Sequence, residues 1–292
     1  MRSDTLDIGG PVHVADFGGS GEPMVLVHGL GGSHVNWLAV GPPLAEHFHV
    51  VAPDLAGFGL TPPAGRSCSV TANAALLTAY LEQIGRPVVL VGNSMGGAIA
   101  MLVAARSPHL VERLVLVDPA LPAPLRGMPD LTVLGAFAAY AIPGLGEAYV
   151  RRRAERLGPE GMVRETMRIC TVDMSRIPAD VLQAHIELAR RRRAFAYPVD
   201  AYLEAARSLV RLLALRRRML ATMRSITVPT LLLQGDKDRL VDLSAAQAAA
   251  RACPSWRFEV FADIGHLPML EAPQRFVDSV LRFCAASTAD AA

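Results

Sequence analysis

This sequence of 292 residues has few cysteines, a single lysine and no long apolar run. The four cysteines have neither C-x-x-C spacing nor a nearby histidine pair, so we expect free, buried thiols rather than disulfides or a metal site at Cys68, Cys170, Cys253 and Cys284. Gly, Pro or charge interrupts every apolar stretch before the roughly 18 to 20 residues that a membrane span requires. The sequence starts without an apolar signal-type segment, so a cytoplasmic protein is expected.

The charge of the chain is small and unevenly distributed. A formal net charge of +2 argues against a general nucleic-acid binder. Residues 121–224 hold 18 arginines and 10 acidic residues, a local charge of +8, whereas the remainder carries −6. The middle third of the chain is therefore a different kind of segment from its flanks.

Apolar runs of strand type alternate with helical patterns on both sides of this middle third. Strands are predicted over residues 4–17 (two short ones), 23–27, 48–52, 88–91, 111–117, 228–233 and 256–261. Helices are predicted over residues 36–45, 70–84, 96–106, 243–252 and 273–286. This alternation predicts an α/β protein with a mostly parallel sheet covered on both faces. In such sheets the ligand lies beyond the C-terminal ends of the strands.

The middle third lacks strand-type runs and shows helical periodicity. Its first half is predicted to be divided into short helices by Pro122, Pro124, Pro129, Pro143 and Pro159, whereas residues 179–193 and 201–222 are predicted as longer helices. We interpret it as a helical cap inserted over the strand ends. The predicted organisation is a core domain in two parts (1–120 and 225–286), a helical cap (121–224) and a tail (287–292).

The stretch Val88 to Met101, VVLVGNSMGGAIAM, combines a strand, a forced turn and a helix. Gly92 and Gly96 lie two residues on either side of Ser94, where a sharp turn that exposes a nucleophile needs neighbours without side chains. His28 and Asp118 follow other predicted strands. These side chains are therefore expected at the same edge of the sheet as Ser94.

Serine becomes a strong nucleophile only when a base removes its proton, and a carboxylate must hold that base in one tautomer. Asp238 and His266 follow later strand-type runs, which gives the chain order Ser, Asp, His. Together the motifs HGLGG (28–32), GNSMGG (92–97), GDKD (235–238) and GHLPMLEAPQRF (265–276) closely resemble the α/β-hydrolase fold family. They span almost the whole chain apart from the insertion. The resemblance implies a doubly wound α/β-hydrolase fold with a helical cap, and chemistry without a cofactor or metal.

Carried over residue by residue, the resemblance makes Ser94 the nucleophile, His266 the general base and acid, and Asp238 the orienting carboxylate. The backbone N–H groups of Leu30 and Met95 would form the oxyanion hole.

Other residues compete for these roles. Asp236 is an alternative carboxylate, although the family pattern G-x-x-D favours Asp238. Asp118 is a second alternative, because some relatives place their acid after this strand. Asp54 is expected to brace its glycine-rich loop, and His28 to support the oxyanion loop through hydrogen bonds. Surface or core positions are expected for the histidines without motif context, which are His34, His47, His49, His109 and His185.

The sequence leads to three hypotheses of function. The first is a serine hydrolase that cleaves carboxylic esters with a hydrophobic acyl part, since the predicted cap is rich in Leu, Met and Ala. The second is hydrolysis of a C–C bond in aromatic ring-fission products, whose enzymes have an elbow similar to GNSMGG but an aromatic residue after the catalytic histidine, where this chain has Leu267. The third is a ligand-binding protein without catalysis. Ser94 argues against epoxide opening and halide displacement, because relatives with those activities use an aspartate there.

The expected partner is a small molecule, an apolar ester in the first hypothesis, with no nucleic acid and no membrane contact. The sequence gives no indication of oligomeric state. Arginine runs at 151–153, 190–193 and 216–218 are expected to be solvated helix faces. The alternative is that one arginine on the inner face of the cap pairs with a substrate carboxylate.

Overall fold

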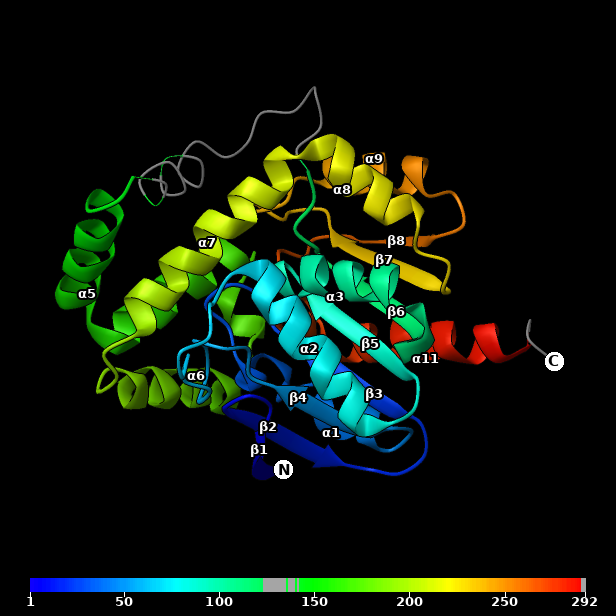
Figure 1. The fold of residues 1–292 in the computed structure, drawn as a ribbon, viewed down its shortest axis with the longest axis horizontal. Coiled ribbons are helices and arrows are strands. Elements are labelled where there is room, and N and C mark those ends of the chain that lie inside the picture. The colour runs from blue at the N-terminus through cyan, green and yellow to red at the C-terminus, as the bar shows by residue number, and fades with distance from the viewer. Residues whose placement is uncertain (123–134, 136–139, 141, 290–292) are drawn as a thin grey trace.

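An eight-stranded, mostly parallel sheet forms the centre of the protein (Figure 1). The computed structural model describes residues 1–122, 135, 140 and 142–289, so the breaks predicted at Pro124 and Pro129 lie outside the described residues. The strands are β1 (Arg2–Asp7), β2 (Pro11–Gly18), β3 (Pro23–Val27), β4 (His49–Pro53), β5 (Val88–Asn93), β6 (Val111–Val117), β7 (Thr230–Gly235) and β8 (Arg257–Phe261). Their order across the sheet is β1-β2-β4-β3-β5-β6-β7-β8. Among these strands, the β1–β2 and β2–β4 pairs are antiparallel and the other five pairs are parallel, so the prediction of a mostly parallel sheet is confirmed.

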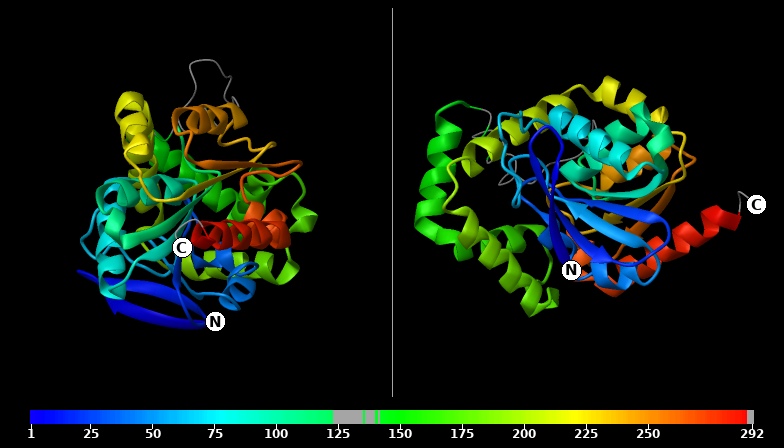
Figure 2. Two further views of the ribbon diagram at one scale, coloured as in Figure 1. Left: turned by 90° about the vertical axis from the view of Figure 1, so that its right-hand side faces the viewer. Right: turned by 60° about the horizontal axis from the view of Figure 1, so that its bottom comes forward.

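Helices cover both faces of the sheet (Figure 2). The short ones are η1 (His34–Trp37), α1 (Gly41–Ala45), η2 (Pro108–Leu110), η3 (Met174–Arg176) and α10 (Pro268–Glu271). The longer ones are α2 (Val70–Ile84), α3 (Met95–Arg106), α5 (Leu145–Cys170), α6 (Ala179–Arg192), α7 (Pro198–Ala214), α8 (Arg216–Arg224), α9 (Leu243–Ala252) and α11 (Pro273–Ala289). The first core cluster contains residues of α2, α3, α8 and α9, and the second contains residues of α1 and α11.

Strand β5 shows why a central strand contains an uninterrupted apolar run, here Val88 to Val91. Val88 and Leu90 belong to the first core cluster, and Val89 and Val91 to the second. Successive side chains of a strand point to opposite faces, so a strand with helices on both sides must be apolar at every position. The predicted α/β architecture, a mostly parallel sheet covered on both faces, is therefore confirmed.

The helices α5 to α8 lie between β6 and β7 in the chain (residues 145–224, the helical segment). Helices α5, α6 and α7 lie at the end of the sheet to which the β5 arrow points, whereas α8 packs on α3 and α9 (Figure 1). Pro159 falls within α5, where the chain kinks at Gly158 (φ 63°, ψ 177°). The prediction of one continuous helix over 201–222 is wrong. Leu215 (φ −80°, ψ 51°) separates α7 from α8, because its backbone leaves the helical region.

The prediction of buried cysteines outside disulfides is confirmed: Cys68, Cys170, Cys253 and Cys284 are all buried, and none of them forms a disulfide within the described part of the chain. Within the described residues, no helix is both long enough and apolar enough to span a bilayer.

Candidate active site

Ser94 lies on a strained turn between β5 and α3. Its φ of 55° and ψ of −119° lie in a region that residues with a Cβ rarely adopt, and its side chain is partly exposed. A Cβ added to Gly96 would lie 2.3 Å from the Val27 oxygen, and a Cβ on Gly92 would lie 2.5 Å from the Gly96 oxygen. The backbone of β3, β5 and α3 therefore approaches too closely for any side chain at these two positions.

Hydrogen bonds hold this turn against strand β6. The Ser94 N–H donates to the Val117 oxygen at 3.0 Å, and the Ser94 oxygen accepts from the N–H groups of Ala98 (3.1 Å) and Ala120 (2.9 Å). The strained conformation is thus fixed by its surroundings, as expected where a side chain must be presented in one position.

The loop after β3 lies directly against Ser94. A Cβ on Gly29 would lie 2.9 Å from the Ser94 Cβ, and the Gly32 N–H donates to the Gly29 oxygen at 3.1 Å, which closes a turn around Leu30. Met95 is the first residue of α3, so its N–H has no acceptor within the helix and lies at the positive end of the helix dipole. Met95 thus directly follows Ser94, and Leu30 directly follows Gly29, the loop residue that approaches the serine.

His266 and Asp238 form a buried hydrogen-bonded pair. The distance from His266 Nδ1 to Asp238 Oδ2 is 2.7 Å, and the two side chains are 4% and 0% exposed. Asp238 also accepts three further hydrogen bonds, from Gln234 Nε2 (3.1 Å), Leu240 N (2.8 Å) and Val241 N (3.0 Å). The carboxylate is therefore fixed on both oxygens, and the orientation of the imidazole follows from it.

Asn93 connects the histidine loop to the serine turn. Its Nδ2 donates to the Val117 oxygen at 3.0 Å and to the His266 oxygen at 3.2 Å. In the described part of the chain, no hydrogen bond joins Ser94 Oγ to the His266 ring. Catalytic hydrogen bonds are often long before substrate binds and shorten in the complex. The structure thus brings the backbone of His266 to the residue that precedes Ser94.

The two alternative carboxylates have different surroundings. Asp236 Oδ1 accepts from the Asp263 N–H at 2.7 Å and Oδ2 lies 3.7 Å from Lys237 Nζ, so this side chain is engaged away from His266. Asp118 is fully buried, and its Oδ1 accepts the Gly235 N–H at 2.8 Å. Asp118 lies close to the proposed pair: one of its carboxylate oxygens, one carboxylate oxygen of Asp238 and one ring nitrogen of His266 are all within 4.8 Å of one another.

His28 and Asp54 stabilise the loops around the site. His28 Nε2 accepts the Leu55 N–H at 3.1 Å, so Nδ1 carries the proton and donates to the Gly29 oxygen at 2.8 Å. Burial lowers the pKa of His28 to about 4, which keeps the ring neutral. Asp54 is fully buried; burial alone would raise its pKa, but hydrogen bonds from His13 and His34 hold the pKa below its usual range.

The structure also identifies groups that sequence reasoning missed. His266 N–H donates to the Cys170 oxygen at 2.6 Å, at the end of α5. Glu271, within the quoted motif at 265–276, is buried; its carboxylate accepts the N–H groups of Gly265 (2.8 Å), Val172 (2.7 Å) and Asp173 (2.9 Å). Glu271 therefore ties the histidine loop to the helical segment. The motif marked the position of this glutamate, but not its partners, which lie about a hundred residues earlier in the chain.

Arg192, in the arginine run at 190–193, approaches the core loop that contains Gly57. Its Nη2 donates to the Gly57 oxygen at 2.9 Å, and its buried Nε has no partner in the described chain. Burial lowers the pKa of this arginine, and Asp54 opposes the shift. Three other arginines of these runs form ion pairs with acidic side chains: Arg151 with Asp200, Arg153 with Glu165, and Arg190 with Glu160.

Among the residues that the structure describes, two groups of side chains have the donor types of a metal site. One is His13, His34 and Asp54, and the other is Asp118, Asp238 and His266. In both groups a histidine nitrogen already forms a hydrogen bond to the central aspartate. Internal hydrogen bonding therefore accounts for the proximity of these donor atoms.

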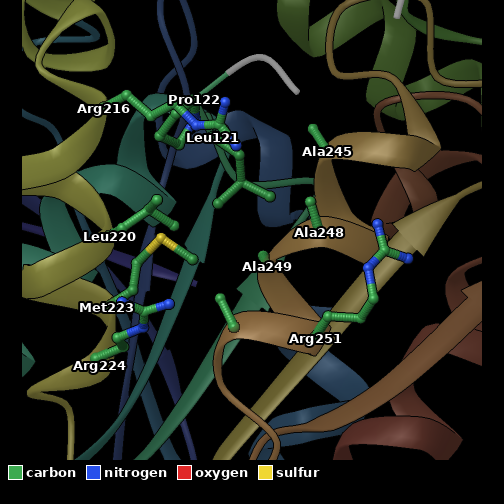
Figure 3. A pocket seen from close by; sticks show the side chains of 11 residues that line it. Leu121, Pro122, Arg216, Leu220, Met223, Arg224, Ala245, Ala248, Ala249 and Arg251 are labelled. Atoms are coloured by element: carbon green, nitrogen blue, oxygen red, sulfur yellow. The ribbon is translucent and has the colours of Figure 1, made fainter. Parts of the chain in front are cut away.

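A separate pocket of about 290 Å³ lies between α8 and α9 (Figure 3). Leu121, Leu220, Met223 and the alanines of α9 form its apolar wall, and Arg216, Arg224 and Arg251 also line it. None of the candidate catalytic side chains lines this pocket.

Comparison with known proteins agrees with this geometry. The sequence model of the alpha/beta hydrolase family matches residues 24–279, and the chain belongs to this family. It is 29% identical to the 2-hydroxy-6-oxo-2,4-heptadienoate hydrolase of Pseudomonas putida, over 92% of this chain and 91% of that protein. It is 25% identical to Lipase 1 of Psychrobacter immobilis, over 97% of this chain and 83% of that protein. The crystal structure of a membrane phospholipase A superposes with a TM-score of 0.75 at 28% identity, over 98% and 86% of the two chains.

Proposed function

We propose that this protein is a serine hydrolase that cleaves carboxylic esters with a hydrophobic acyl part through an acyl-enzyme. The observation that carries the proposal is the buried His266–Asp238 pair, with its 2.7 Å hydrogen bond, at the sheet edge where Ser94 is presented on a strained turn. Each of these three residue types has a defined task in acyl transfer, and family membership supports the assignment.

The proposed mechanism follows from the hydrogen bonds of the pair. Asp238 holds Nδ1 of His266 as its protonated nitrogen, which leaves Nε2 free to accept the proton of Ser94 Oγ as this oxygen attacks the ester carbonyl. The imidazolium then protonates the leaving alcohol, and the same base activates a water molecule that releases the acid.

The negative charge of the tetrahedral intermediate needs hydrogen-bond donors. We assign this role to the N–H groups of Met95, which directly follows Ser94, and of Leu30, which follows the glycine that packs against the serine. Both are backbone groups, so side-chain substitution at either position is expected to reduce the rate less than loss of a side-chain donor.

The preference for an apolar acyl group is supported by the contacts of Leu30. Its side chain packs against a buried cluster of Tyr140, Leu203 and Ala206, and a Cβ on Gly31 would lie 3.2 Å from the ring of Tyr202. Apolar residues of α7 thus adjoin the loop that is proposed to bind the carbonyl. We infer that the helical segment, as the greater part of a cap over residues 121–224, supplies apolar contacts to the acyl chain.

Turnover of p-nitrophenyl esters of graded chain length tests the proposal. Wild-type protein is expected to hydrolyse them with an optimum above acetate, and Ser94→Ala is expected to lose the activity. Equal rates in wild type and Ser94→Ala would reject the proposal, and so would absence of turnover over the whole series, which would favour a ligand-binding protein without catalysis.

Hydrolysis of a C–C bond in a ring-fission product is the second candidate. It is supported by the relative from Pseudomonas putida, whose name describes this kind of substrate, and by the position of Arg192. A buried guanidinium with an unpaired Nε fits a substrate carboxylate. It ranks second because Leu267, which packs in the core, occupies the place of the aromatic residue. Turnover of a vinylogous 1,5-diketone acid in preference to the esters would reverse this order.

A further inference from the structure

A second buried carboxyl lies beside Asp238. Asp118 directly follows β6 and has φ 43°, a left-handed conformation that Asp adopts more readily than most residues with a Cβ. Its side chain is inaccessible to solvent, and one of its oxygens lies within 4.8 Å of both an Asp238 oxygen and a His266 nitrogen. The proposed mechanism leaves this acid without a role.

The two carboxyls have unequal sets of hydrogen bonds. Asp238 accepts four, whereas Asp118 accepts one on Oδ1, and its buried Oδ2 has no donor in the described part of the chain. A buried oxygen of an ionised carboxylate without a donor is unfavourable, whereas a protonated oxygen is itself a donor. Two carboxyls that share a buried site also cannot both ionise without strong repulsion. The proton of such a pair therefore belongs on Asp118.

We propose that Asp118 is a neutral carboxylic acid whose Oδ2–H donates a hydrogen bond to Asp238, and that it is a positioning residue for the Asp238–His266 pair. Burial and the neighbouring Asp238 carboxylate raise the pKa of Asp118 well above its ordinary value, in agreement with this geometry. The donated hydrogen bond spreads the charge of Asp238 over two carboxyl groups. It thereby weakens the attraction of Asp238 for a protonated His266 ring.

Two further titratable groups face this cluster from other elements. Glu271 of α10 has a fully buried side chain, and it is stabilised by three backbone N–H groups and by Arg176 Nη1 at 3.7 Å from Oε1. Its charge adds to the repulsion that keeps Asp118 protonated. Cys170 of α5 is neutral, because burial and Asp238 raise the pKa of its thiol to about 12. The charge of Glu271 thus favours the protonated form of Asp118, and we place the proton between Asp118 and Asp238 on Asp118.

Two substitutions separate a neutral from an ionised Asp118. In Asp118→Asn the amide oxygen still accepts the Gly235 N–H and the amide N–H still donates to Asp238, so kcat/KM for an ester is expected within about two-fold of wild type. The acidic limb of its pH profile should not move. Asp118→Ala lacks the donor, so kcat/KM should fall roughly ten-fold and the acidic limb should move to higher pH. A loss in Asp118→Asn as large as that in Asp238→Asn would overturn the proposal.

Infrared spectroscopy tests the proton without substrate. The difference spectrum between wild type and Asp118→Asn at neutral pH should contain the C=O stretch of one protonated carboxyl, present only in wild type. Absence of this band would refute the inference, even if Asp118→Ala did not fold. The kinetic part rests on the proposed function, but the infrared part does not. Failure of ester turnover with the band present would therefore reject only the function.

Discussion

Asparagine at position 238 would alter the proposed catalytic pair with almost no change in shape. Asp238 Oδ1 accepts two backbone N–H groups, and Oδ2 accepts the donors of Gln234 and His266. If the amide oxygen of the asparagine stays with the backbone groups, its NH₂ faces two other donors. His266 must then take the other tautomer, with the proton on Nε2, and this nitrogen can no longer accept the Ser94 proton.

The expected loss in kcat for Asp238→Asn is therefore about 10²- to 10⁴-fold, which corresponds to roughly 3 to 5 kcal/mol of transition-state stabilisation. The assay is the steady-state hydrolysis of a p-nitrophenyl ester, with thermal unfolding as a check that the variant is folded. Asp236→Asn is the matched control, because this carboxylate is engaged with Asp263 and Lys237, and its activity should stay within about two-fold of wild type. The reasoning is refuted if Asp236→Asn is the damaging change, or if Asp238→Asn keeps more than about a tenth of the activity.

Three further predictions follow from the surroundings of the site. Gly96→Ala should destabilise the fold by about 1 to 3 kcal/mol in denaturant unfolding, because the added Cβ would lie 2.3 Å from the backbone oxygen of Val27. Gly161→Ala is the control: its added Cβ would contact only the side chain of Leu157, so stability should change by less than about 1 kcal/mol. The pKa of His28 is about 4 in the folded protein and 6.5 ordinarily, so between pH 4 and pH 6.5 the unfolded chain binds more protons than the folded one. The free energy of unfolding should therefore fall by up to about 3 kcal/mol as the pH is lowered from 6.5 to 4, and this decline should be smaller in His28→Asn. Arg192→Gln should raise KM for a ring-fission acid roughly ten-fold or more and leave KM for a neutral ester unchanged; equal effects on both substrates would show that this arginine does not bind the carboxylate.

The sheet and the elbow could be predicted because their causes are local. Val88 to Val91 are apolar without interruption, which is what burial on both faces requires, and the glycines around the serine mark a turn where the backbone approaches too closely for a side chain. The motif G-x-x-D also favoured Asp238 over Asp236, and the hydrogen bonds to His266 and Asp263 agree with that choice.

The remaining features depend on contacts that no local pattern encodes. Leu215 interrupts a stretch with unbroken helical periodicity, so the end of α7 is fixed by packing rather than by a breaking residue. The approach of Asp118 to Asp238 follows from the neighbouring positions of β6 and β7 in the sheet, which the sequence order alone does not give. The partners of Glu271 at the end of α5 likewise come from the docking of the helical segment on the core.

Labelling by a fluorophosphonate probe tests the central claim, an activated hydroxyl at position 94, without assuming any substrate. The label is expected on Ser94 of the wild-type protein, as located by mass spectrometry of the digested chain, at a rate that falls by at least about 10²-fold in His266→Asn. No label on Ser94 in the folded wild-type protein, or an equal rate in His266→Asn, would contradict the account.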